Sequence, residues 1–177
     1  MNTTTDSIHA ACTAQTTIAT PLGPLLLART ANGLAGAWFA GQKHHPEPLT
    51  AVRRPDDALL RRAAEQLLAY FAGESSGFDV PLDLHGTAFQ RRVWAALRQI
   101  PTGRTLTYDE IARSIGSPSA VRAVGGAVGR NPLSVIVPCH RVVGTDGSMT
   151  GYAGGVERKR ALLELERSEE RRVGKEC

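Results

Sequence analysis

A helix-turn-helix pattern in the second half of the chain constrains the fold more than any other feature of the sequence. Thr107 and Ser119 can each cap a short helical segment, YDEIARSIG and AVRAVGGAVGR respectively, because their hydroxyl groups can accept from free backbone amides at a helix start. Gly116-Ser117-Pro118 lies between the two segments and is typical of a tight turn. Two short helices joined in this way predict a helix-turn-helix.

The first part of the chain carries strand patterns instead. TTIAT and PLLLART are strand-like runs that meet at Pro21-Leu22-Gly23-Pro24, and Asn32-Gly33 leads from the second run into LAGAWFA. Asn-Gly between two apolar runs is a strong hairpin signal, so residues 15–40 predict a small antiparallel sheet. Two further runs are weaker strand candidates, FDVPLDL at residues 78–84 and LSVIVP at residues 133–138.

Helical periodicity marks three further segments. Residues 56–72 place apolar side chains three and four apart, with Asp56 as the predicted N-cap and Gly73 as the residue that ends the helix. AFQRRVWAALRQI, capped by Thr87, and the closing amphipathic segment VERKRALLELE lie on either side of the helix-turn-helix. Together with the strand patterns, these helices predict an α+β fold.

We divide the chain into three parts on these patterns. Residues 1–85 are expected to form a small N-terminal α/β domain that contains the antiparallel sheet, and residues 86–166 a mostly helical domain. Residues 167–177, RSEERRVGKEC, are polar, have no apolar period and match a translated sequencing adapter. They therefore predict a disordered or artefactual tail.

The two main parts differ in charge. Residues 1–85 contain 6 Lys and Arg against 8 Asp and Glu, whereas residues 86–166 contain 11 against 6. A basic half beside an acidic half suggests a polyanion as the partner of the basic half, although ordinary surface charge explains the same numbers. Apolar residues make up 42% of the chain, which is enough for a packed core and too many for an intrinsically disordered chain.

Cysteine spacing and apolar runs bear on location and on metal binding. Cys12, Cys139 and Cys177 are widely separated and give neither a disulfide framework nor a C-x-x-C zinc site, which suits a reducing cytoplasm. No apolar run approaches the ~18 residues of a membrane-spanning helix, and the first residues lack the basic and apolar stretches of a secretory signal. We therefore expect a cytoplasmic protein without a membrane partner and without a metal site.

The chemically most suggestive segment is Pro138-Cys139-His140-Arg141. The thiolate is the reactive form of cysteine, and a nearby histidine and arginine can lower the pKa of the thiol, so Cys139 is a candidate nucleophile. A lone cysteine after an apolar run is more commonly a small buried hydrophobe, and neighbours in the sequence need not face each other. These residues alone leave both interpretations open.

The chain resembles the O6-alkylguanine-DNA alkyltransferases, closely over residues 87–166 and loosely over residues 15–86. The matching segments are Phe89-Gln90, Val93-Trp94, Ile100-Pro101, Thr107-Tyr108, Arg122-Ala123-Val124-Gly125, Asn131-Pro132, Pro138-Cys139-His140-Arg141-Val142, Gly151-Tyr152-Ala153-Gly154-Gly155 and Leu162-Leu163-Glu164-Leu165-Glu166. The resemblance implies a winged-helix-like unit that binds DNA and repairs it by direct, single-turnover alkyl transfer, without a cofactor.

By that resemblance, four residues carry the chemistry. Cys139 attacks the alkyl carbon on O6 of guanine and keeps the alkyl group as a stable thioether. His140 deprotonates Cys139 through a water, and Glu166 orients His140 and stabilises its charge. Tyr108 donates a hydrogen bond to N3 of the flipped guanine and so stabilises the leaving purine.

The resemblance also implies the contacts to DNA and to the flipped base. Arg122 enters the base stack through the minor groove and fills the gap left by the extruded base, while Ala123 and Gly125 allow close approach to the groove wall. Arg141 is placed among the DNA contacts. The residues implied for the guanine pocket and its supports are Val142, Tyr152, Ala153, Gly154, Asn131 and Lys159.

The expected partner is double-stranded DNA that carries O6-alkylguanine, or O4-alkylthymine as a further candidate, bound by a monomer. Three other interpretations compete: a sensor that binds alkylguanine without reacting, a helix-turn-helix regulator, and a cysteine hydrolase that uses Cys139 and His140. Cys139 argues against the sensor, because related sensors replace the nucleophile. The regulator needs extra length and a cysteine-rich zinc module, and the hydrolase would turn over repeatedly.

Overall fold

The computed structural model describes residues 8–149 and 151–175 and has an α+β fold. The chain forms two compact units, Met1–Thr87 with Pro132–Ser134, and Ala88–Asn131 with Val135–Cys177, which we call unit 1 and unit 2. Unit 1 thus includes a short segment that lies far along the sequence from the rest of it. The chain leaves unit 2 after residue 131 and re-enters it at residue 135.

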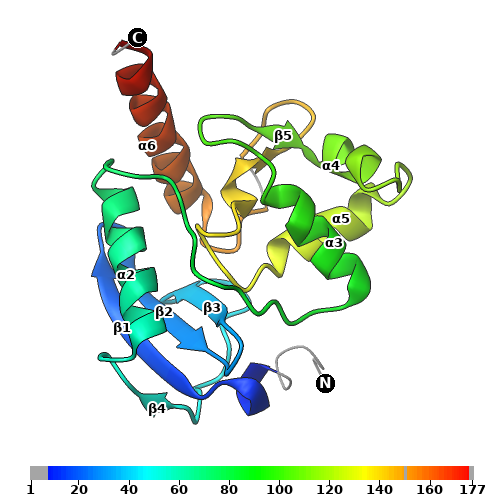
Figure 1. Cartoon of the computed structure of the whole chain (residues 1–177). Helices are drawn as coiled ribbons and strands as arrows, with labels where there is room; N and C mark the ends of the chain where they lie inside the picture. Colours follow the sequence, from blue (N-terminus) through cyan, green and yellow to red (C-terminus); the bar gives the residue numbers. More distant parts are fainter. Residues whose placement is uncertain (1–7, 150, 176–177) are drawn as a thin grey trace. The chain divides into compact units, whose positions relative to one another are not determined.

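Unit 1 is built on a four-stranded sheet with the strand order β3-β2-β1-β4 (Figure 1). β1 (Ala14–Thr20) and β2 (Gly23–Arg29) are antiparallel, and β3 (Leu34–Phe39) pairs antiparallel with β2. β4 (Val52–Arg53) runs parallel to β1. The antiparallel sheet predicted for residues 15–40 is confirmed, whereas β4 is too short to leave a pattern in the sequence.

α2 (Ala58–Phe71) packs on this sheet, and its buried side chains recur every three or four residues (Figure 1). Its N-cap is Asp57, whose carboxylate accepts a hydrogen bond from the backbone N–H of Leu60 at 3.0 Å. The prediction of Asp56 as N-cap was wrong by one residue, since both aspartates suit the position by type. Gly73 follows the helix at φ +73°, a conformation that glycine adopts without strain.

Unit 2 contains the predicted helix-turn-helix. α4 (Tyr108–Ser114) and α5 (Val121–Gly129) form the helix pair, and α3 (Ala88–Leu97) packs against both. The buried indole N–H of Trp94 donates to the Ala127 carbonyl at 2.9 Å, which ties α3 to α5. The helix pair is therefore held in place by a third helix.

The two predicted caps of this helix pair have different outcomes. Thr107 forms a capping box on α4: its hydroxyl accepts from the Glu110 N–H, and the Glu110 carboxylate accepts from the Thr107 N–H. The prediction of Ser119 as the cap of α5 was wrong, because the N-cap position falls on Ala120, which makes no side-chain capping bond.

The rest of unit 2 consists of short elements and one long helix. β5 (Leu106–Thr107) and β6 (Val142–Val143) pair in parallel, and a single 3₁₀ turn, Cys139–Arg141, precedes β6. α6 (Val156–Lys175) is helical over residues 167–175, where the sequence predicted a disordered or artefactual tail; an artefactual origin stays a prediction. Neither α6 nor any other helix of the described residues is long and apolar enough to cross a membrane.

Residues 78–84 and 133–138, the weaker strand candidates, are not strands in the structure. Each contributes one isolated bridge to β3, through Leu82 and Leu133 respectively. Val135 has φ +74°, so the second run leaves the extended region of backbone space shortly after its bridge. Apolar side chains alone did not reveal this change of backbone direction.

Candidate active site

Cys139 begins the 3₁₀ turn of unit 2 and is buried. Its backbone N–H donates to the Val137 carbonyl at 2.8 Å, so the chain turns sharply at Pro138. Burial raises the pKa of the Cys139 thiol to about 11, although a hydrogen bond with Asn131 and the positive charge of Lys159 act in the opposite direction. At neutral pH the thiol is therefore protonated, and a reaction through the thiolate would need a base to remove this proton.

His140 is fully buried and is held by Glu166 of α6, with Nε2 of His140 at 2.8 Å from Oε2 of Glu166. Burial lowers the pKa of His140 despite the opposing effect of Glu166, so the ring is neutral at neutral pH. An ionised carboxylate can only accept, so Nε2 carries the proton and Nδ1 is the basic nitrogen. Nδ1 has no hydrogen-bond partner among the described residues.

Glu166 is fully buried and yet ionised. Burial by itself raises the pKa of its carboxyl group, but hydrogen bonds from His140 and Arg141 outweigh this effect and hold the pKa at about 2. Arg141 donates from Nε to Oε1 at 2.8 Å and from Nη2 to Oε2 at 2.9 Å. Its Nη1 donates to the Ile100 carbonyl at 2.6 Å. The prediction that Arg141 contacts DNA is therefore corrected: the guanidinium is buried and fixes Glu166.

Lys159 of α6 is a second buried cation in unit 2. Its Nζ donates to the Val142 carbonyl at 2.5 Å, and burial lowers the pKa of Lys159 while Cys139 raises it. The resemblance implies both Val142 and Lys159 for the guanine pocket and its supports. A carbonyl oxygen has two lone pairs, so the bond from Lys159 uses only part of its accepting capacity.

Asn131 follows α5 and connects it to the segment that leads to Cys139. Its Nδ2 donates to the Val137 carbonyl at 2.7 Å, and the same side chain is hydrogen-bonded to the Cys139 thiol. Asn131 is buried, so both bonds form away from water. The structure thus brings Asn131, Cys139, His140, Glu166 and Lys159 together in one buried cluster.

Tyr108 lies against the glycine-rich loop of residues 151–155. A Cβ on Gly151, which has φ +81°, would lie 2.9 Å from the Tyr108 hydroxyl oxygen. A Cβ on Gly154 would lie 2.6 Å from the ring of the buried Tyr152. The backbone conformation at residue 151 therefore favours glycine, and a side chain at residue 154 would displace the Tyr152 ring. Burial, together with Cys139, raises the pKa of Tyr108, so its hydroxyl stays protonated and can donate a hydrogen bond.

The residues expected to contact DNA through α5 lie apart from this buried cluster. Arg122 and Ala123 are exposed and Gly125 is half-buried, whereas Val124 faces the core. A Cβ on Gly126 would meet no atom within 4 Å, so the glycine leaves open space on the helix surface. The second helix of the pair thus presents one basic side chain among small ones.

Two family models together match most of the chain. The DNA binding domain of 6-O-methylguanine DNA methyltransferase matches residues 88–168, and the ribonuclease-like domain of 6-O-methylguanine DNA methyltransferase matches residues 14–84. The chain belongs to the 6-O-methylguanine DNA methyltransferase family. The second match extends to the N-terminal part, where the resemblance in the sequence is loose.

Relatives in this family cover nearly the whole chain. A methylated-DNA--protein-cysteine methyltransferase of Mycobacterium tuberculosis H37Rv is 54% identical over 152 residues, which are 86% of this chain and 91% of that protein. One of Methanosarcina acetivorans is 51% identical over 149 residues, 84% of this chain and 94% of that protein. The structure of Mycobacterium tuberculosis OGT in complex with DNA matches with a TM-score of 0.82 at 51% identity, covering 88% of this chain and 94% of that one.

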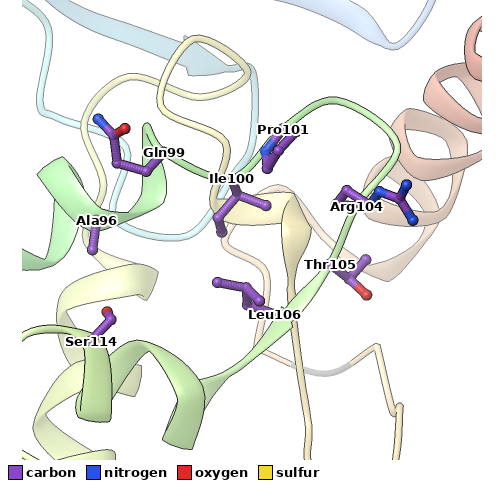
Figure 2. Close-up of a pocket in the computed structure, with 8 residues that line it drawn as sticks. All are labelled: Ala96, Gln99, Ile100, Pro101, Arg104, Thr105, Leu106 and Ser114. Atoms are coloured by element: carbon purple, nitrogen blue, oxygen red, sulfur yellow. The ribbon is translucent and has the colours of Figure 1, made fainter.

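A cavity of about 430 Å³ in unit 2 is lined by none of the residues predicted for the site. Figure 2 shows Ile100 and Leu106 at the centre of this lining, with Gln99 and Ser114 at its edge. One lining residue, Ile100, accepts a hydrogen bond from Arg141 through its backbone carbonyl. Within the described residues, no group of three or more His, Cys, Asp or Glu could hold a metal ion.

Sequence reasoning missed the partner of Arg141 in this member of the 6-O-methylguanine DNA methyltransferase family. A signal was present, because Arg141 is followed by Val142-Val143 and preceded by an apolar run, a context that favours burial. Burial of an arginine in turn requires an acidic partner. Glu166 was named for His140 alone, although its two oxygens can serve both neighbours.

Proposed function

We propose that this protein repairs DNA by transferring the alkyl group of O6-alkylguanine to its own Cys139, once per molecule. Family membership and the names of the relatives support this reaction class. The observation that carries the assignment is the buried His140–Glu166 pair, in which His140 is the residue after Cys139 and keeps Nδ1 as its basic nitrogen. O4-alkylthymine is a further candidate substrate, because it carries the alkyl group on a comparable exocyclic oxygen.

The charges of the cluster suggest how the thiolate is generated. Nδ1 of His140 takes the thiol proton of Cys139 through a bridging water, and Glu166 stabilises the imidazolium that results. Arg141 keeps Glu166 ionised and correctly oriented. The neutral resting state of His140 is what makes it a competent base at neutral pH.

The transfer itself is a single displacement. The Cys139 sulfur attacks the alkyl carbon, the S–C bond forms as the C–O6 bond breaks, and the electron pair remains on the purine. Tyr108 donates a hydrogen bond to N3 of the leaving purine, whose negative charge is neutralised by a proton from the medium. The thioether product does not hydrolyse, so the protein acts once and needs no cofactor.

DNA binding is assigned to residues 86–166, and mainly to α5. Arg122 would fill the gap in the base stack while the damaged base is extruded into a pocket formed by Tyr152, Ala153 and Gly154. Ala123 and Gly125 would allow the helix to approach the groove wall closely. We also propose that the protein acts as a monomer in the cytoplasm, since a transfer to its own cysteine needs no second subunit.

Intact-protein mass spectrometry tests this function directly. After incubation with a duplex that carries one O6-methylguanine, the protein should gain one methyl group, and peptide mapping should place it on Cys139. The gain should saturate at one methyl group per chain. Binding without any mass gain would instead indicate an alkylguanine sensor, and repeated release of product would indicate a hydrolase.

A further inference from the structure

Three residues of unit 1, Pro132–Ser134, lie five to seven residues before Cys139 in the sequence. Within Pro132–Ser134, the Pro132 carbonyl accepts from the Ala37 N–H at 2.8 Å, and the Ser134 N–H donates to the Ala37 carbonyl at 3.0 Å. The Ser134 hydroxyl also donates to Oε1 of Gln42 at 3.3 Å, and this oxygen accepts from the Phe39 N–H at 2.8 Å. Ser134 and Gln42 are both buried, so water cannot replace their bond.

The next residue has an unfavourable backbone conformation. Val135 has φ +74° and is almost completely buried. A β-branched residue in the left-handed region is a genuine outlier, and such strain persists only where the surrounding structure over-determines it. Isolated from its neighbours, Val135 would return to negative φ.

Anchors on both sides hold this strained residue in place. On the upstream side are the bonds of Ser134 to Ala37 and Gln42. On the downstream side, Nδ2 of Asn131 donates to the Val137 carbonyl at 2.7 Å, and the same carbonyl accepts from the Cys139 N–H at 2.8 Å. A change of φ at residue 135 would therefore move the carbonyl that both Asn131 and Cys139 use.

We propose that Ser134 and Gln42 are positioning residues for alkyl transfer: their hydrogen bond locks Val135 in the left-handed conformation and thereby sets the position of Cys139. This inference rests on the proposed function for its activity readout. Neither residue touches the reacting atoms. Loss of the Ser134 hydroxyl releases one anchor, so Val135 relaxes in part of the molecules and Cys139 is no longer held against Asn131 in them.

A double-mutant cycle tests the lock. Ser134→Ala should slow methyl transfer from an O6-methylguanine duplex by about fivefold, the effect of one buried neutral hydrogen bond. In the Val135→Gly background the same substitution should slow transfer by less than about twofold, because glycine adopts positive φ without strain and has nothing to relax. Val135→Ala is the matched control: it removes the same buried methyl groups but still disfavours positive φ, so the fivefold effect should persist.

A second readout separates this inference from the proposed function. This readout is the pH profile of the rate at which iodoacetamide alkylates Cys139, measured by peptide mass mapping. The profile should change in Ser134→Ala and should return to the original profile when Ser134→Ala is combined with Val135→Gly. Thr30→Val, which removes the partly buried hydrogen bond from Thr30 to Asp83 elsewhere in unit 1, should lower the melting temperature without changing this pH profile. If the wild type accepts no methyl group, the proposed function fails. The iodoacetamide rates still test whether the Ser134–Gln42 hydrogen bond positions Cys139. The positioning role of Ser134 and Gln42 would be overturned if Ser134→Ala had equal effects in the Val135 and Val135→Gly backgrounds, or no effect in either.

Discussion

At the scale of single residues, Glu166 decides the balance of charge in the buried cluster. One of its oxygens serves His140 and both serve Arg141, and all three side chains are buried. A buried ion pair is weak evidence for net stability, but removing one partner leaves the other charge uncompensated and costs about 3–5 kcal/mol. Glu166 therefore links the tautomer of the base to the stability of unit 2.

Glu166→Gln should reduce stability at neutral pH and also change its dependence on acid. The pKa of Glu166 is lowered from 4.5 to about 2 in the folded protein, so its ionised form stabilises the fold above pH 4.5, and this contribution is lost as the pH falls towards 2. The contribution is about 3 kcal/mol, from the size of the shift. Urea unfolding should show a difference between wild type and variant of about 3–5 kcal/mol near pH 7 that shrinks strongly near pH 3. A difference independent of pH would contradict this assignment.

Cys139→Ala should separate binding from chemistry. The small buried side chain makes no ion pair, so the variant should fold and bind the alkylated duplex within about twofold of the wild-type affinity. It should gain no methyl group, because no other side chain takes over a displacement of this kind. Fluorescence anisotropy and intact mass, measured on the same preparation, check both statements. Methylation of the variant would place the acceptor elsewhere.

At the scale of elements, α5 is the part of the helix pair whose exposed residues are expected to act on DNA. Arg122→Ala should slow transfer from duplex DNA by about tenfold, since the extruded base loses the side chain that replaces it in the stack. Transfer from the free O6-alkylguanine base should change little. Arg130→Ala, at the exposed C-cap of α5, loses the same charge and serves as control. An equal loss in both variants would mean that Arg122 contributes charge alone.

Elements with local signals could be predicted from the sequence, and those defined by distant pairing could not. Thr107 with Glu110 three residues on is a local pattern, and the capping box forms as expected. Residues 133–138 have the apolar composition of a strand, but their partner is a single residue of β3 and Val135 turns the backbone away. Ser119 is not the cap of α5, because the helix starts one residue later than predicted, with Ala120 at the N-cap position.

At the scale of the whole molecule, the uneven charge should appear in the salt dependence of binding. The basic residues of 86–166 outnumber the acidic ones by 11 to 6. If they neutralise about five phosphates, the affinity for duplex DNA should fall by roughly 10²–10³-fold between about 50 mM and about 200 mM salt. Anisotropy titrations over that range, with undamaged duplex for comparison, measure the slope. Binding that does not respond to salt would contradict phosphate-based recognition.

In the candidate active site, too, contacts between neighbours in the sequence could be predicted, whereas contacts between distant residues could not. Cys139 and His140 are neighbours, so their segment was found directly as a candidate nucleophile and base. Glu166 was named only through the family resemblance, because nothing in its local sequence shows that α6 brings it to His140. The apolar context of Arg141 favours its burial, but its pairing with Glu166 is a tertiary contact that local sequence does not show. The inclusion of residues 132–134 in unit 1 likewise follows from tertiary pairing.

The interleaving of the two units in the chain has a consequence for how the protein is made. β3 is an edge strand of its sheet, and its backbone at Ala37 is paired by Pro132 and Ser134. During translation this edge emerges from the ribosome long before its partner, so at ~5–20 residues per second the nascent chain carries an uncovered strand for roughly 5–20 seconds. An open edge is a template for association with other chains. Synthesis that stalls before residue 132 would therefore leave an aggregation-prone fragment, whereas the finished chain covers this part of its own edge.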